Sequence, residues 1–96
     1  DSWSLLARAH TTINDFENAI YAYNKALEFN EKDIIVCFNL AEVLLVYGQI
    51  SIGKGEKNIG LERWLKAKEL LVQVISINPN HTKALTRLNQ LNERIK

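Results

Sequence analysis

Apolar residues recur at spacings of three and four along most of the chain, which is the period of an amphipathic helix. No stretch carries the alternation of apolar and polar residues that is typical of a half-buried strand. The pattern therefore predicts an all-α domain of five antiparallel helices. These helices are expected at residues 2–12, 14–30, 34–47, 61–77 and 83–95.

Residues near the predicted helix ends explain these boundaries. Asn14 followed by Glu17 resembles a capping box, in which two side chains bond the free N–H groups at a helix start. Gly48 is expected to end the third helix and Pro79 to end the fourth, whereas Thr82 is expected to cap the fifth.

The four glycines of the chain all lie between residues 48 and 60. Such clustering is typical of a flexible loop, which we expect between the third and fourth helices. Part of it, GQISIGKG, matches a phosphate-binding loop up to Gly55, where Ser or Thr would hold Mg²⁺. Because this loop would follow a helix and not a strand, we expect an ordinary insertion.

Each predicted helix has one apolar face, and with 47% apolar residues the chain can bury a continuous core. The positions expected to face inward are Trp3, Leu6, Ala7 and His10 in the first helix, Phe16, Ala19, Ile20, Tyr23, Ala26 and Leu27 in the second, Cys37, Leu40, Ala41 and Leu44 in the third, Trp64, Ala67, Leu71 and Val74 in the fourth, and Leu85, Leu88, Leu91 and Ile95 in the fifth.

The first and third predicted helices repeat one pattern, in which Leu6 aligns with Leu40 and Ala7 with Ala41. The shift between them equals the tetratricopeptide period of about 34 residues. Residues 1–33 resemble that family at its signature positions, which here are Trp3, Leu6, Ala7, Phe16, Ala19, Tyr23 and Ala26. Ala7 replaces the usual Gly of the family, and Glu31 replaces its usual Pro.

The second copy retains Leu40, Ala41, Ala67, Leu71 and Pro79 but is longer. The interval from Ala41 to Ala67 is more than twice the interval from Ala7 to Ala19, so the second copy contains an insertion. The resemblance implies a right-handed superhelix of about two and a half repeats. We expect a first repeat at 1–33, a second at 34–81 with an insertion at 48–61, and a capping helix at 82–96.

The resemblance also implies a non-catalytic protein–protein interaction module that binds a peptide or protein segment in a concave groove. Family geometry places in this groove Arg8, Phe38, Asn39, Glu42, Leu45, Lys83 and Arg87, together with Ser4, Thr11 and Gln90. An apolar side chain of the segment would pack on Phe38 or Leu45, while the basic residues pair with its carboxylates. The alternative is a structural fragment of a larger scaffold that contacts subunits through its convex face or the 48–60 loop.

Part of this groove resembles the carboxylate clamp of chaperone-binding members of the family. Asn39, Lys83 and Arg87 match it, whereas Ser4 and Arg8 stand where the family has Lys and Asn. Because a clamp needs several converging donors, we interpret these cations as solvated charges on exposed helix faces and not as a true clamp. In a looser sense, an acidic segment is an expected occupant of the groove.

Composition and single residues exclude other classes of function. A net charge of +1 does not favour nucleic acid, and the longest apolar run, residues 43–47, is far shorter than the roughly 20 residues that span a bilayer. His10, His81 and the single Cys37 lack metal-ligand spacing, and no nucleophile, base and orienting group occur together. We expect no cofactor and no enzymatic activity.

A finer resemblance concerns the third helix, the interrupted repeat and the NPNHTKAL sequence from Asn78. These features are similar to tetratricopeptide domains of bacterial accessory proteins in c-type cytochrome maturation, which bind a client apoprotein. That resemblance implies a periplasmic location, whereas the cytoplasm is the default expectation. Because the sequence begins at Asp1 without Met, we expect flanking repeats in a longer parent chain.

Overall fold

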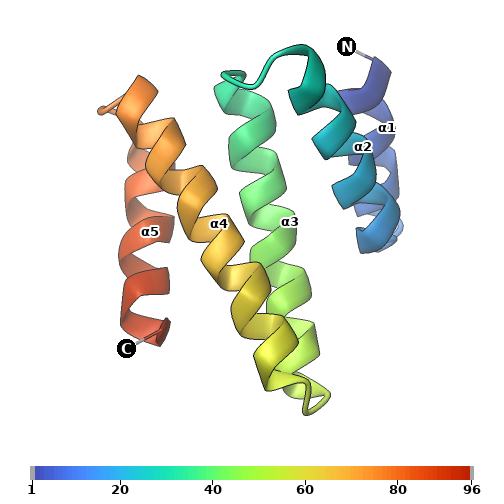
Figure 1. Ribbon diagram of the computed structural model, residues 1–96, viewed down its shortest axis with the longest axis vertical. Helices are drawn as coiled ribbons and strands as arrows, with labels where there is room; N and C mark the ends of the chain where they lie inside the picture. The colour runs from blue at the N-terminus through green and yellow to red at the C-terminus, as the bar shows by residue number, and fades with distance from the viewer. Residues whose placement is uncertain (1, 96) are drawn as a thin grey trace.

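The computed structural model describes residues 2–95 and shows five α-helices joined by short turns (Figure 1). No strand occurs within these residues, so the predicted all-α fold is confirmed. The helices are α1 (Ser2–Thr12), α2 (Phe16–Phe29), α3 (Ile34–Gly53), α4 (Lys57–Ile77) and α5 (Thr82–Ile95).

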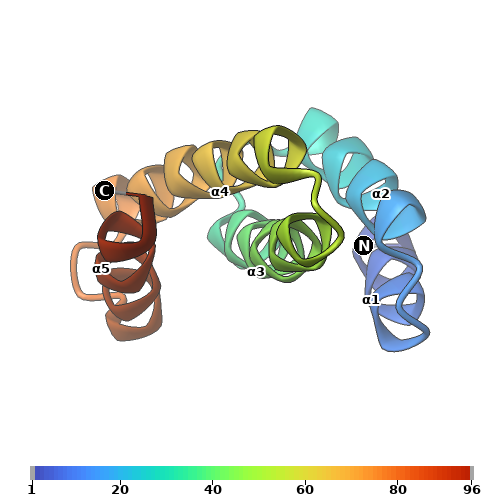
Figure 2. The same ribbon diagram turned by 90° about the horizontal axis from the view of Figure 1, so that it is seen from below.

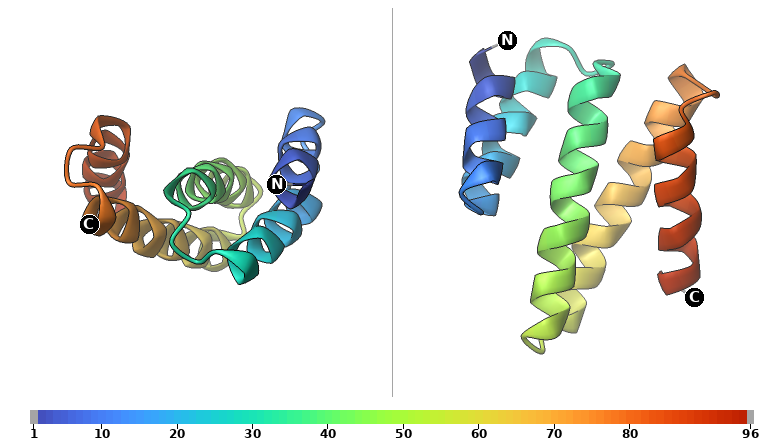
Figure 3. Two further views of the ribbon diagram at one scale, coloured as in Figure 1. Left: turned by 90° about the horizontal axis from the view of Figure 1, so that it is seen from above. Right: turned by 180° about the vertical axis from the view of Figure 1, so that it is seen from behind.

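The helices form two layers of a curved array. Figure 2 shows α2 and α4 along the outer side, while α1, α3 and α5 lie on the inner side. The same arc is visible from above in Figure 3, where α1 and α5 stand at opposite ends and α3 lies between them. The inner layer is therefore made of the first, third and fifth helices, as the repeat predicts.

Small residues allow the helices to approach closely. Ala7, Ala19, Ala26, Ala41 and Ala67 are each no more than 1% exposed. Larger apolar side chains fill the space around them, and the largest that are fully buried are Leu40, Leu71, Leu91, Val74 and Cys37. Neighbouring helices in the sequence pack on one another, so one core runs through the array.

The region between the third and fourth helices differs from the prediction. Helix α3 continues through Gly48 to Gly53, and α4 begins at Lys57, so only residues 54–56 form the connection. The prediction of a flexible 48–60 loop was therefore wrong. The inserted residues lengthen both helices into a hairpin that extends beyond the ends of α1 and α2 (Figure 1).

Two of the four glycines lie where α3 and α4 are in close contact. A Cβ atom on Gly48 would lie 2.6 Å from Cδ1 of Trp64 and 2.9 Å from the carbonyl oxygen of Gly60. A Cβ atom on Gly60 would lie 2.7 Å from the carbonyl oxygen of Gly48. These glycines therefore permit close helix packing, whereas Gly55, with φ of 87°, forms the turn itself.

Two predicted caps were also wrong. Asn14 lies in the left-handed region with φ of 61°, Asp15 holds the N-cap position of α2, and no side chain caps that helix. At the start of α5 the N–H of Ala84 donates to Nδ1 of His81 over 3.1 Å, so His81 takes the role expected of Thr82.

The prediction of which residues face inward in the terminal helices was only partly correct. Leu6 is 45% exposed and Leu85 is 39% exposed, whereas Ala84 is fully buried in place of Leu85. His10 is half-buried beside Asp15, with 3.4 Å between Nδ1 and Oδ2. The first and last helices each have neighbours on one side only, so fewer of their apolar residues are covered.

Helix α3 is more apolar than the run at residues 43–47 suggested. By length and composition it could cross a membrane, since it has 20 residues and its most apolar window has a mean hydropathy of 1.8. Of that window, 44% is buried inside the domain. Its composition thus agrees with its position as the central helix, packed against both α2 and α4.

Candidate functional site

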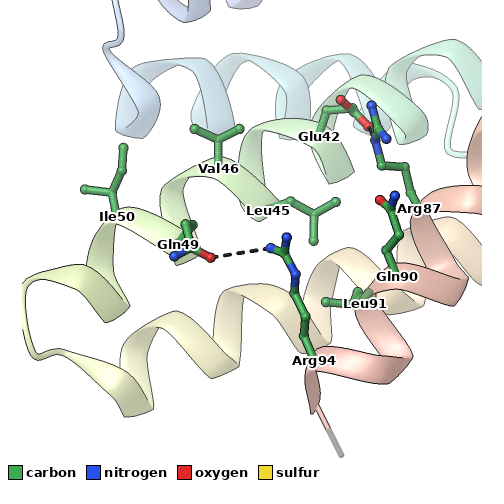
Figure 4. Close-up of a pocket in the computed structure, with 9 residues that line it drawn as sticks. All are labelled: Glu42, Leu45, Val46, Gln49, Ile50, Arg87, Gln90, Leu91 and Arg94. Atoms are coloured by element: carbon green, nitrogen blue, oxygen red, sulfur yellow. Dashed lines mark hydrogen bonds and ion pairs between the residues drawn. The ribbon is translucent and has the colours of Figure 1, made fainter.

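A groove of about 350 Å³ separates α3 from α5 on the inner side of the array (Figure 4). It is lined by Glu42, Leu45, Val46, Gln49, Ile50, Arg87, Gln90, Leu91 and Arg94. The first five of these residues come from α3 and the other four from α5. We call this space the main groove.

The two walls of the main groove differ in character. The α3 wall has an apolar surface formed by Leu45, Val46 and Ile50, with Val46 49% exposed and Ile50 38% exposed. The α5 wall is polar and basic, because Arg87 and Arg94 lie two helical turns apart on one face. The groove thus offers a surface for an apolar side chain beside donors for an anionic group.

An ion pair joins the two walls at one end of the main groove. Nε of Arg87 lies 2.5 Å from Oε1 of Glu42, and the two side chains meet across the groove in Figure 4. They are 42% and 34% exposed. Arg87 is therefore already paired with a carboxylate of the domain itself.

A second, smaller cavity of about 260 Å³ lies on the other side of this ion pair. It is lined by Phe38, Glu42, Thr82, Lys83, Thr86 and Arg87. The ring of Phe38 lies 5.0 Å from that of His81, the residue that caps α5. We call this space the polar compartment, since threonine and charged side chains make up most of its lining.

At the other end of the main groove, Arg94 reaches across to α3. Its Nη1 lies 3.4 Å from Oε1 of Gln49, the contact drawn as a dashed line in Figure 4. The guanidinium also lies 6.0 Å from the ring of Trp64, whose Nε1 donates to the carbonyl oxygen of Leu45 over 3.1 Å. Trp64 therefore connects the α3 wall to α4 beneath the groove.

The structure brings together five of the seven predicted site residues, namely Phe38, Glu42, Leu45, Lys83 and Arg87. Asn39 is half-buried on α3 and lines neither cavity. Arg8 is exposed on α1, at the opposite end of the array from α5 (Figure 3). The predicted basic residues therefore do not converge on one point.

Sequence reasoning missed Val46, Gln49, Ile50, Leu91 and Arg94 as lining residues. The signal was present, because these positions continue the spacing of three and four from Glu42 and Arg87. For Gln49 and Ile50 the signal was lost because the helix was expected to end at Gly48.

Shifted pKa values occur away from the groove. Burial raises the pKa of the Cys37 thiol and of the Tyr23 phenol. The hydrogen bond from the Tyr47 hydroxyl to Oε1 of Glu17, 2.9 Å long, raises the pKa of Tyr47. These groups belong to the packing of the helices and do not form a reactive site.

The residues considered for metal or phosphate chemistry have other surroundings. Among residues 2–95, no three His, Cys, Asp or Glu side chains are placed to hold a metal ion. The stretch that resembles a phosphate-binding loop is helical from Gly48 to Gly53. A phosphate loop would instead precede a helix and present its backbone N–H groups.

Comparison with known families agrees with the helical pattern. The model of the tetratricopeptide repeat family matches residues 1–33. This stretch is therefore similar to a tetratricopeptide repeat. Such repeats mediate protein–protein interactions and are not themselves catalytic, and their arrays present concave binding surfaces. No curated protein matches the chain.

Proposed function

We propose that this domain binds a segment of another protein in the main groove between α3 and α5. The observation that carries the proposal is the pairing of an apolar α3 wall with a basic α5 wall on the inner side of a tetratricopeptide-like array. Leu45, Val46 and Ile50 would bury an apolar side chain of the segment. Lys83 and Arg94 would attract acidic groups on either side of it.

The main groove is suited to a short segment and not to a large folded surface. A space of about 350 Å³ accommodates one or two side chains, at the lower end of the range for ligand sites. Affinity for a segment of this size would come from one buried apolar anchor, and charge would set the selectivity.

Two matched valine variants test this proposal. Val46 lines the main groove and is 49% exposed, while Val72 on α4 is 48% exposed and lines neither cavity. Peptides selected from a random library on the unmodified domain should bind V46D about tenfold or more weakly, because its carboxylate would enter the apolar contact. Binding to V72D should not change. Equal binding to both variants would refute the groove.

The resemblance to cytochrome maturation proteins adds one specific occupant. On that hypothesis the segment comes from an unfolded client apoprotein. A peptide from an apocytochrome c should then compete with the selected library peptides for the main groove. Failure to compete would remove this client and leave the groove proposal intact.

A second candidate function is that of a structural unit in a larger scaffold. Leu5 and Leu6 on α1 are 65% and 45% exposed, and Ile50 and Ile59 near the hairpin tip are 38% and 41% exposed. These apolar positions suit contacts with further repeats or subunits. If the parent protein depends on them, L5K/L6K should disrupt its assembly while peptide binding in the groove persists.

A further inference from the structure

The ion pair between Glu42 and Arg87 stands at the boundary between the main groove and the polar compartment. Both residues line both cavities. Their side chains remain 34% and 42% exposed, so each is accessible from the groove. A segment that lies along both cavities must therefore pass directly over this pair.

Positively charged side chains outnumber negatively charged ones around the ion pair. The cationic side chains of Lys83, Arg87 and Arg94 line the two cavities, whereas Glu42 is the one carboxylate among the described residues that line them. Charge complementarity therefore favours an anionic occupant. A guanidinium can bind that anion through two parallel N–H groups, but the guanidinium of Arg87 is already paired with Glu42.

We propose that Glu42 is an internal competitor for the acidic group of the bound segment. In the free domain its carboxylate occupies Arg87, and an acidic side chain of the partner displaces it on binding. The partner segment would carry an acidic residue beside an apolar one, because Arg87 adjoins the apolar wall at Leu45. This inference rests on the proposed function of the main groove.

Displacement is feasible because the pair is partly solvated. Exposed ion pairs contribute little net free energy, so the released carboxylate of Glu42 regains hydration at small cost. A neutral segment gains nothing from displacing it. Glu42 would therefore lower the affinity for acidic segments without affecting amide-bearing ones, and so act as a specificity-determining residue.

The test compares two synthetic peptides by isothermal titration calorimetry. One has the sequence Asp-Leu-Glu-Leu-Asp and the other its amide counterpart, Asn-Leu-Gln-Leu-Asn. The variant E42Q should bind the acidic peptide about two- to fivefold more tightly than the unmodified domain does, the range expected for an exposed ion pair. Affinity for the amide peptide should not change.

Two further variants separate this effect from a general change in charge. E62Q removes the same charge from an exposed position on α4 and should not alter either affinity. R87Q should weaken the binding of the acidic peptide. The double variant E42Q/R87Q should bind this peptide no more tightly than R87Q does, since the competition requires both groups. Thermal melts of each variant verify that it is folded.

The outcomes distinguish this inference from the proposed function. If the unmodified domain binds the acidic peptide and E42Q binds it equally or more weakly, Glu42 is not a competitor and the groove stands. If E42Q binds the acidic peptide and the unmodified domain does not, competition is supported. If neither protein binds either peptide, this inference fails, whereas the groove proposal is judged separately by the comparison of V46D with V72D.

Discussion

Gly48 on α3 and Gly60 on α4 are in backbone contact, so that a Cβ atom on either would lie within 3 Å of the other's carbonyl oxygen. The contact is at the base of the hairpin formed by α3 and α4. It also positions Trp64, which donates to the α3 backbone beneath the main groove. The packing of the insertion and the shape of the groove therefore depend on the same helix crossing.

Alanine at Gly48 or Gly60 should destabilise the domain. Each methyl group would clash with backbone that cannot move independently, which we expect to lower the free energy of unfolding by about 1–3 kcal/mol. This loss exceeds the gain of about 1 kcal/mol in helix propensity. Urea denaturation of G48A and G60A measures the effect.

Gly53 provides the matched control for these variants. It lies at the end of α3, and a Cβ atom there would have no atom within 4 Å. G53A should therefore be neutral or stabilise the domain by up to about 1 kcal/mol. If G48A and G60A behave like G53A, the helices do not pack as closely as described.

Tyr47 should make stability sensitive to alkaline pH. The hydrogen bond to Glu17 raises the pKa of Tyr47 above its usual value of 10.0. The stability that this hydrogen bond contributes is therefore fully present below pH 10 and is lost as the pH rises through the folded-state pKa of Tyr47. Y47F removes the bond but keeps a ring to stack on Phe16, at a cost of about 0.5–1.5 kcal/mol at pH 8.

The difference in stability between Y47F and the unmodified domain should shrink when the pH is raised from 8 to 11. Thermal or urea denaturation at both pH values measures it. Y21F serves as the control, because Tyr21 is 54% exposed and its ring contacts Trp3, whereas the carboxylate of Glu17 accepts the hydrogen bond from Tyr47. An unchanged difference at pH 11 would contradict the assigned role of the hydrogen bond.

His81 should stabilise the start of α5. H81A removes the acceptor for the N–H of Ala84 and should cost about 0.5–2 kcal/mol, as for other N-cap replacements. H81N supplies an oxygen acceptor but loses the ring contact with Phe38. Thermal denaturation should therefore rank H81N between H81A and the unmodified domain. Equal stability of all three would exclude the cap.

Cys37 should react slowly with thiol reagents in the folded domain. The residue is fully buried and burial raises its pKa, so both access and thiolate population are low. The rate of labelling by a disulfide reagent at pH 8 should increase by orders of magnitude on adding urea above the unfolding midpoint. Rapid labelling without urea would show that α3 is not packed as described.

Part of the candidate site follows from the sequence and part does not. Phe38, Glu42 and Leu45 follow one another at spacings of three and four, so their common face on α3 could be predicted. The ion pair of Glu42 with Arg87 joins residues 45 positions apart, and nothing in the local sequence distinguishes it from pairing with a ligand. The partner of a surface charge depends on distances that only the packed helices define.

The number and order of the helices can be predicted from the sequence alone, because the spacing of apolar residues and the small residues Ala7, Ala19 and Ala26 reflect local geometry and packing needs. It also identified the tetratricopeptide period, which the family match supports at residues 1–33. By contrast, tertiary packing accounts for the helical conformation of most of residues 48–60. Isolated glycines disfavour a helix by about 1 kcal/mol each, whereas close contact with Trp64 and the facing backbone requires the absence of a Cβ atom. At Gly48 and Gly60, helix propensity therefore disfavours glycine while tertiary packing requires it, and the packing effect is the larger of the two.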